Sequence, residues 1–352
     1  MTATPPPDRA RRDHGRPHHT PSSFSAYVVT AGDGDRVDAG IRVLDVDQLG
    51  TDGVTVQVDW SAVNYKDAMV TRPGNRVARI SPLVPGVDLV GTVLTATTTS
   101  LEAGARVIVQ GYGLGVDHHG GFAQLARVPA EWVVPLPAGI TDRQAATIGT
   151  AGFTAALSLS RLEAAGLSAG QGPVLVTGAS GGVGSMAVTL LAACGYEVVA
   201  STGKISERAY LEGLGASEVI DRDTLASAPE RTLGPERWAG AVDCVGGSTL
   251  GAVLRTLRYG AAVAASGLTG GNAIETSVYP FIVRDNSLIG VDTVSTPIDE
   301  RRRVWERMAT AFPAGPLDDM VAGEVGLGEL TPVLDRILAG AGRGRTLVVP
   351  NR

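Results

Sequence analysis

The chain has 352 residues, which is more than one ordinary hydrophobic core organises and about right for two domains. Its net charge of −6 argues against a broad basic field of the kind that gathers nucleic acid or anionic lipid. Cys194 and Cys244 are too few for a disulfide framework or a thiolate metal cage, and no apolar run approaches the roughly 20 residues of a membrane span. We therefore expect a cytoplasmic protein with neither nucleic-acid nor membrane partners.

The first part of the chain has the pattern of a tail followed by strands. Residues 1–22 combine prolines, arginines and histidines with almost nothing apolar, which predicts a disordered tail. From about Ser25 to Pro135, short β-branched runs are separated by Gly, Pro and Asp, as in a compact, partly closed β domain. These strand-like runs are AYVVT (26–30), VTVQVDWSAV (54–63), LVGTVLTATT (89–98), RVIVQG (106–111) and EWVVPLP (131–137). From about Thr141 onward, Ala and Leu at helical spacing predict one or two connecting helices over 142–167.

Strand and helix patterns then alternate. Strands are predicted at 173–178, 197–202, 218–221, 241–246 and 261–267, with helices at 182–194 and 206–216 and another ending at Arg258. This order is typical of an α/β fold with a doubly wound parallel sheet, the Rossmann arrangement.

The last part of the chain is predicted to return to the first domain. After a strand-like stretch at 287–294, the pattern predicts helices at 297–312 and near Glu329 to Leu338, and a strand at 345–350. We expect residues 23–148 and 296–352 to form the β-rich domain and residues 149–295 to form the Rossmann domain.

A glycine-rich turn at 178–184 is the most informative segment. Gly178, Gly181, Gly182 and Gly184 stand between a predicted strand and a predicted helix, where they permit a tight bend and let helix N-terminal amides approach a pyrophosphate. The spacing departs from G-x-G-x-x-G because Ser180 occupies the second position. The strand–turn–helix–strand context favours a dinucleotide site. The alternative is a tight turn that holds nothing.

The end of the following strand selects the cofactor. An NAD site usually carries Asp or Glu there to accept the ribose hydroxyls, whereas this chain has Ser201, Thr202, Gly203 and Lys204. Hydroxyls and an ammonium suit a 2′-phosphate, and Arg222 is positioned to add a second charge. We predict NADPH, the alternative being that Lys204 is an ordinary surface lysine.

Histidine and cysteine positions predict no metal. Three of the five histidines lie in the tail, and His118 and His119 lie in one loop, so no central set of zinc ligands is available. Without a metal, the chemistry left for a bound dihydronicotinamide is hydride transfer to an acceptor that is already electrophilic, either a conjugated carbonyl or a quinone.

Several segments carry a family resemblance. They are SAVNYKDAMV (61–70), PGVDLVGTV (85–93), HHGGFAQLARV (118–128), IGTAGFTA (148–155), VTGASGGVGS (176–185), STGK (201–204) and YPFIVRDNSLIGVDTV (279–294). In this order they resemble the medium-chain dehydrogenase/reductase superfamily, and within it the zinc-free quinone-oxidoreductase branch that contains bacterial acrylyl-CoA reductase. The resemblance implies a GroES-like first domain, a Rossmann second domain, a homodimer and NADPH-dependent reduction of acryloyl-CoA to propanoyl-CoA.

The resemblance also assigns residues. The cofactor-contacting positions that it implies are Tyr65, Ser180, Gly181, Gly182, Val183, Thr202, Gly203, Lys204, Arg222, Leu268 and Ile282. Lys204 stands where family members often carry Arg, which keeps the charge but loses the planar fork.

The NYKD stretch occupies the position where zinc relatives place a metal ligand, so the substrate is expected there. Tyr65 is the catalytic candidate, to orient the nicotinamide or donate to the acceptor oxygen, although a tyrosine that only packs is the alternative. Asn64, Lys66 and Arg76 are the substrate candidates. Lys66, Arg72, Arg76 and Arg79 form a basic cluster suited to CoA phosphates, or else a solvated loop. Asp88 is expected to be structural.

Three functions follow from these residues. The first is a 2-enoyl-thioester reductase, the second is an NADPH:quinone oxidoreductase, and the last in rank is an NADPH-binding protein without enzymatic activity. In each case the partner is a small molecule.

Overall fold

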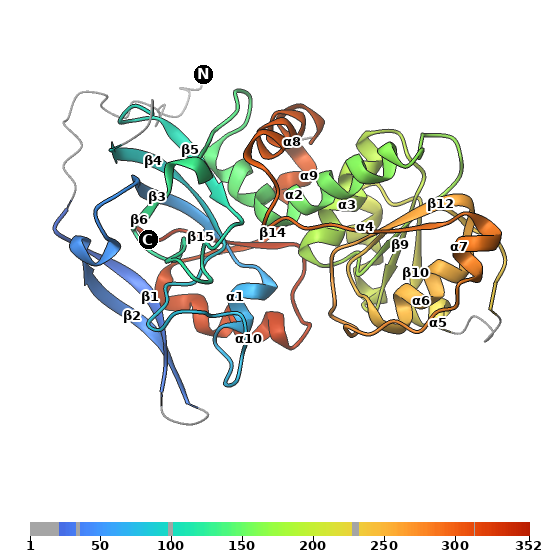
Figure 1. Cartoon of the computed structure of the whole chain (residues 1–352), viewed down its shortest axis with the longest axis horizontal. Coiled ribbons are helices and arrows are strands. Elements are labelled where there is room, and N and C mark those ends of the chain that lie inside the picture. The colour runs from blue at the N-terminus through green and yellow to red at the C-terminus, as the bar shows by residue number, and fades with distance from the viewer. Residues whose placement is uncertain (1–20, 33–35, 98–100, 227–231, 313) are drawn as a thin grey trace, which may run out of the picture.

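The computed structural model describes residues 21–32, 36–97, 101–226, 232–312 and 314–352. The tail predicted for residues 1–22 lies, up to residue 20, outside the described residues. Two bodies lie side by side along the longest axis of the molecule (Figure 1). One is rich in strands and contains both early and late parts of the chain, and the other is a sheet flanked by helices.

The first body is built on a mostly antiparallel sheet. In spatial order its strands are β14 (Val321–Val325), β15 (Arg345–Val348), β3 (Val54–Ala62), β4 (Asp88–Ala96), β5 (Arg106–Gln110) and β7 (Val134–Pro135), and β6 (Leu125–Val128) also pairs with β3. Beside this sheet, β1 (Ser23–Ala31) and β2 (Val37–Asp45) form an antiparallel hairpin.

Both faces of this sheet are covered, which explains its near-continuous apolar runs. Val56 and Val107 face a cluster inside the β-rich body, whereas Val90 and Ile108 face the cluster packed around helix α2 (Asp142–Ala164). Successive side chains of a strand point to opposite faces, so a strand buried on both sides is apolar at every position.

The second body contains a six-stranded, all-parallel sheet. Its spatial order is β10 (Glu218–Asp221), β9 (Val198–Thr202), β8 (Val174–Thr177), β11 (Trp238–Asp243), β12 (Leu257–Ala265) and β13 (Ser287–Gly290). Numbered from β8, this order is 3-2-1-4-5-6, the Rossmann arrangement. The predicted α/β fold with a doubly wound parallel sheet is confirmed.

Helices connect and cover the two sheets. Thr141 caps the start of α2, and its hydroxyl accepts from the Gln144 amide. The predicted connecting helices form this single element, which breaks at Gly149, where φ is 45°. Helices α8 (Ile298–Ala311) and α10 (Leu330–Leu338) lie where the periodicity predicts them.

The return of the chain places its late strands in the first sheet. β15 pairs antiparallel with β3 and parallel with β14, so a strand from the far end of the sequence lies inside the β-rich body. The boundaries at residues 148 and 296 remain predictions.

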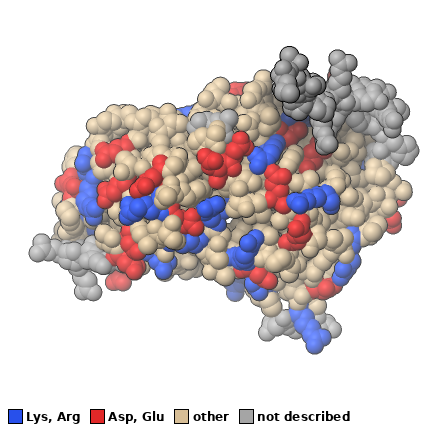
Figure 2. Space-filling model, turned by 180° about the vertical axis from the view of Figure 1, so that it is seen from behind, with Lys and Arg blue, Asp and Glu red and all other residues tan. Residues whose placement is uncertain are grey.

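No helix within the described ranges is long and apolar enough to cross a bilayer. On the face seen in Figure 2, basic and acidic side chains are interspersed across both bodies.

Candidate active site

The glycine-rich turn follows β8 directly and shapes a backbone cradle. Gly178 has φ +61°, and a Cβ on Gly184 would lie 2.3 Å from the Gly178 carbonyl oxygen. Helix α3 (Gly182–Ala193) begins with Gly181 as its N-cap, and the Ser185 amide donates to the Gly181 carbonyl oxygen at 2.9 Å. The preceding amides of the first turn are therefore available to an anionic group beyond the helix N-terminus.

The end of β9 lies beside this turn. The Ser180 and Thr202 hydroxyl oxygens are 3.0 Å apart, and the Thr202 hydroxyl accepts from the Lys204 amide at 3.0 Å. The Arg222 guanidinium lies against Gly203, because a Cβ on Gly203 would be 2.8 Å from the Arg222 Cζ. The structure thus brings together the predicted cofactor residues of the turn, of β9 and of the segment after β10.

Lys204 is already engaged in the folded chain. Its ammonium donates to the Gly342 carbonyl oxygen, in the loop that precedes β15. Burial lowers the pKa of Lys204, although the nearby Glu207 carboxylate opposes this. The side chain therefore has a defined orientation rather than projecting freely into solvent.

The NYKD stretch forms the short helix α1 (Tyr65–Met69). Asn64 is its N-cap, and the Asp67 carboxylate accepts from the Asn64 amide at 2.8 Å. Tyr65 is 41 % exposed at the first position of the helix. Its hydroxyl has no hydrogen-bond partner among the described residues, so it is free to meet a ligand.

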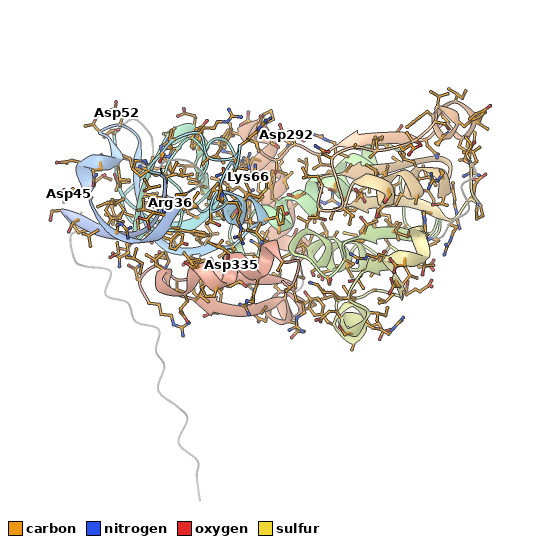
Figure 3. All side chains as sticks on the ribbon, turned by 90° about the horizontal axis from the view of Figure 1, so that it is seen from below. Arg36, Asp45, Asp52, Lys66, Asp292 and Asp335 are labelled. Carbon is orange, nitrogen blue, oxygen red and sulfur yellow. The ribbon has the colours of Figure 1, made fainter. Side chains whose placement is uncertain are left out.

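Lys66 points toward the segment that leaves the Rossmann sheet. Figure 3 shows Lys66 and Asp292 close together where the two bodies meet. Burial alone would raise the pKa of Asp292. The N–H groups of Val294 and Ser295, together with the Lys66 ammonium, outweigh burial, so the pKa of Asp292 is lowered. Arg76 is exposed, and no ion pair is present for it in the part of the chain that the structure describes. Its neighbour Arg72 pairs with Asp335 at 2.9 Å.

A buried polar network lies beneath NYKD and was not found from the sequence. The Asp88 carboxylate accepts from the Asn64 side-chain amide at 2.8 Å, from Arg345 at 3.2 Å, and from the Thr150 amide and hydroxyl at 2.8 and 2.6 Å. Arg345 also donates to the Asn64 side-chain oxygen at 2.9 Å. Asp88 is thus a buried anchor of this network.

Arg345 connects this network to the cofactor turn. A Cβ on Gly182 would lie 3.3 Å from the Arg345 guanidinium, so this side chain contacts the start of α3 as well as Asn64. Arg345 is buried, and besides Asn64 its donors reach the carbonyl oxygens of Thr147 and Val63 and the Asp88 carboxylate. These contacts fix NYKD relative to the glycine-rich turn.

Asp67 is a second buried carboxyl that sequence reasoning missed. Besides the Asn64 amide, it accepts from the amides of Gly86 and Val87 at 3.1 and 2.9 Å. Burial raises the pKa of Asp67 to about 7, and the N–H bonds reduce that rise. Neither Asp67 nor Arg345 is marked by local sequence, because their partners are distant along the chain.

Leu268 and Ile282 are placed differently from each other. Leu268 is 57 % exposed and lies beside Gly246, in the loops after β12 and β11 at the carboxyl end of the sheet. Ile282 is 73 % exposed on α7 (Tyr279–Arg284), which precedes β13 and so lies at the amino end. Within one chain, Ile282 does not meet the glycine-rich turn.

Across the described ranges, no three His, Cys, Asp or Glu side chains are arranged to hold a metal ion. His118 and His119 take part in local bonds instead. The His119 Nδ1 accepts from the Val84 amide at 3.1 Å, and the His118 Nδ1 lies 2.9 Å from the His119 carbonyl oxygen.

Two family models match the chain. Residues 50–138 match the alcohol dehydrogenase GroES-like domain, and residues 182–310 match the zinc-binding dehydrogenase model. The first segment contains β3 to β7 of the mostly antiparallel sheet, and the second contains β9 to β13 of the Rossmann sheet.

Relatives match over nearly their whole length. The chain is 43 % identical to acrylyl-CoA reductase AcuI of Ruegeria pomeroyi over 93 % of this chain and 99 % of the relative. It is 44 % identical to the putative quinone oxidoreductase YhfP of Bacillus subtilis over 89 % of this chain and 95 % of the relative. The crystal structure of Escherichia coli K-12 YHDH with bound NADPH superposes with a TM-score of 0.89 over 93 % of this chain and 100 % of that one, and the two sequences are 43 % identical. The chain therefore belongs to the medium-chain dehydrogenase/reductase superfamily, in the zinc-free branch of these relatives.

Proposed function

We propose that this chain is an NADPH-dependent reductase of 2-enoyl-CoA thioesters that converts acryloyl-CoA to propanoyl-CoA. The observation that carries the proposal is its similarity to AcuI over 99 % of that relative, combined with a glycine cradle beside a strand end that lacks a carboxylate. When bound, NADPH supplies the hydride for the electrophilic carbon.

The residues around the turn fit a phosphorylated dinucleotide. Gly178 has a positive φ, and Gly184 approaches the Gly178 carbonyl oxygen too closely for a Cβ, so the turn is tight enough for the amides that begin α3 to face a pyrophosphate. Thr202 and the cations Lys204 and Arg222 suit the 2′-phosphate, which a carboxylate at this position would repel.

The residues of NYKD are proposed to receive the acceptor. Asn64 is fixed by Asp88 and Arg345, so α1 presents Tyr65 from a rigid base. The Tyr65 hydroxyl is proposed to orient the nicotinamide or donate to the thioester oxygen of the substrate, where negative charge develops as the hydride arrives.

The basic groups near α1 are proposed to bind the CoA phosphates. Lys66 is half-buried at the meeting of the two bodies, and Arg76 is exposed without an ion-pair partner within the described ranges. A cation that is not paired within its own chain is available to a phosphate ligand.

Steady-state kinetics with NADPH test the substrate class. We expect turnover of acryloyl-CoA to exceed that of simple quinones, and Arg76→Ala to raise KM for acryloyl-CoA about tenfold, as the loss of one charge-assisted contact predicts. Arg303→Ala, an exposed arginine on α8, is the matched control and should leave KM unchanged. Turnover of quinones but not of acryloyl-CoA would reject the proposal, and NADPH binding without any turnover would indicate a non-enzymatic role.

The second candidate function is an NADPH:quinone oxidoreductase, which the name of the 44 % identical YhfP favours. A quinone carries no phosphate, so its turnover should be insensitive to Arg76→Ala. The two acceptors are therefore separated by the same variant.

We also propose a homodimer formed through β13, in the cytoplasm. β13 is an edge of the parallel sheet, and its sequence SLIG has no charge or proline to block pairing. Tyr279, Ile282 and Leu288 are exposed on or near this edge. Antiparallel pairing of two copies of β13 would bring α7 of the second copy to the carboxyl end of the sheet, which would account for the cofactor role implied for Ile282.

A further inference from the structure

The loop before β15 packs on the cofactor turn. The Gly344 amide donates to the Ser180 carbonyl oxygen at 3.1 Å, and the Gly342 carbonyl accepts from the Lys204 ammonium. Gly344 allows this approach, because its φ is +53° and a Cβ there would lie 2.8 Å from the Tyr210 hydroxyl. Residue 343, between these two glycines, is therefore held next to the end of β9.

Residue 343 is an arginine with a defined position. Its guanidinium carbon lies 4.9 Å from the centre of the Tyr210 ring, and its Nη1 lies 3.4 Å from a carboxylate oxygen of Glu207. Tyr210 is itself fixed, because its hydroxyl donates to the Ser185 hydroxyl in α3 at 2.9 Å. A guanidinium held over an aromatic ring has a fixed orientation, so the N–H groups at the edge of the guanidinium are pre-organised to donate to an anion.

Glu207 belongs to the turn that follows Lys204. Its amide donates to the Lys204 carbonyl oxygen at 2.9 Å, so the carboxylate is close to the segment expected to meet the 2′-phosphate. An uncompensated carboxylate at this place would repel a phosphate. Arg343 neutralises Glu207 through Nη1, and because a guanidinium has five N–H donors, others remain for a second anion.

We propose that Arg343 is a specificity-determining residue that binds the 2′-phosphate of NADPH together with Lys204 and Arg222. It compensates for the compact ammonium of Lys204 by adding a planar guanidinium from a segment distant in sequence. The inference rests on the proposed NADPH dependence, and it adds that NADPH joins the Rossmann body to the segment that leads into β15.

Calorimetry with nucleotide fragments tests this without requiring turnover. The probes are 2′,5′-ADP and 5′-AMP, which differ by the 2′-phosphate. We expect Arg343→Ala to weaken binding of 2′,5′-ADP about tenfold, as loss of one exposed charge-assisted contact predicts, and to leave 5′-AMP binding unchanged. Arg343→Lys should keep part of the affinity. Arg336→Ala, an exposed arginine on α10, is the matched control and should bind both probes like the unaltered chain.

A double variant separates direct contact from simple neutralisation of Glu207. If Arg343 binds the phosphate directly, Arg343→Ala combined with Glu207→Gln stays weakened for 2′,5′-ADP. Full recovery in the double variant, or equal affinity of Arg343→Ala and the unaltered chain, would overturn the inference. If the unaltered chain showed no preference for 2′,5′-ADP over 5′-AMP, the NADPH proposal would fall first. Equal melting temperatures of the single variants confirm that each is folded.

Discussion

Asp67 shows at the scale of one residue how burial and hydrogen bonding compete. Three backbone amides donate to its carboxylate, which favours the charged form, yet burial raises its pKa to about 7. In the unfolded chain an aspartate titrates near its ordinary pKa of about 4. Between these two values the folded chain binds more protons than the unfolded chain, so the contribution of Asp67 to stability falls as the pH rises.

We expect the free energy of unfolding of the unaltered chain, relative to Asp67→Asn, to fall by up to about 1.4 kcal/mol per pH unit between about pH 4 and pH 7. Above about pH 8 the difference should be flat. Denaturant unfolding of both proteins across this range measures it. A difference that increases with pH would mean that the three N–H bonds outweigh burial.

The residues that sequence could identify are those whose chemistry is local. The glycine-rich turn and the STGK segment are contiguous, and the structure places Ser180 beside Thr202 and Gly203 beside Arg222. Arg345 and Asp88 are 257 positions apart, so their pairing follows only from the fold. The engagement of Lys204 by Gly342 is likewise non-local. Their roles in binding remain predictions.

At the scale of elements, β15 joins the two parts of the candidate site. It pairs with β3 on one side and begins with Arg345, whose guanidinium reaches Asp88 and Asn64. Removing one member of a buried ion pair leaves the other charge uncompensated in a poorly solvated place.

Arg345→Met should therefore destabilise the chain by about 3–5 kcal/mol and lower kcat/KM in the fraction that folds. Arg303→Met on the exposed face of α8 should change stability by less than about 0.5 kcal/mol. Urea unfolding of both variants makes the comparison. A loss below about 1 kcal/mol for Arg345→Met would show that the buried network is not important for stability.

Elements with a strong period were predictable, and short or exposed ones were not. The Rossmann strands and α8 lie where the pattern places them, within a few residues. β2, β6 and β14 were missed. β2 is mostly exposed, and it pairs with β1 along its whole length. Helix α1 has five residues and depends on the capping contact between Asn64 and Asp67.

For the molecule as a whole, the edge strand β13 makes the proposed dimer testable. Leu288→Lys places a charge on this edge, where it would oppose close pairing of two copies. We expect the unaltered chain to sediment as a dimer and Leu288→Lys as a monomer at the same concentration. Val43→Lys, at an exposed site on β2, is the control and should remain dimeric. A monomeric unaltered chain, or a dimeric Leu288→Lys, would contradict this assembly.

The position of β15 inside the first sheet also bears on the order of events during synthesis. The strands β3 to β7 are translated first, then all six strands of the Rossmann sheet, and only then β14 and β15. The Rossmann sheet can therefore assemble on the ribosome while the Ser61–Ala62 end of β3 still lacks its partner strand β15. Until translation reaches Arg345, Asp88 lacks the ion-pair partner that it has in the folded chain. The β-rich body therefore completes its sheet and its buried network only after β15 has been synthesised.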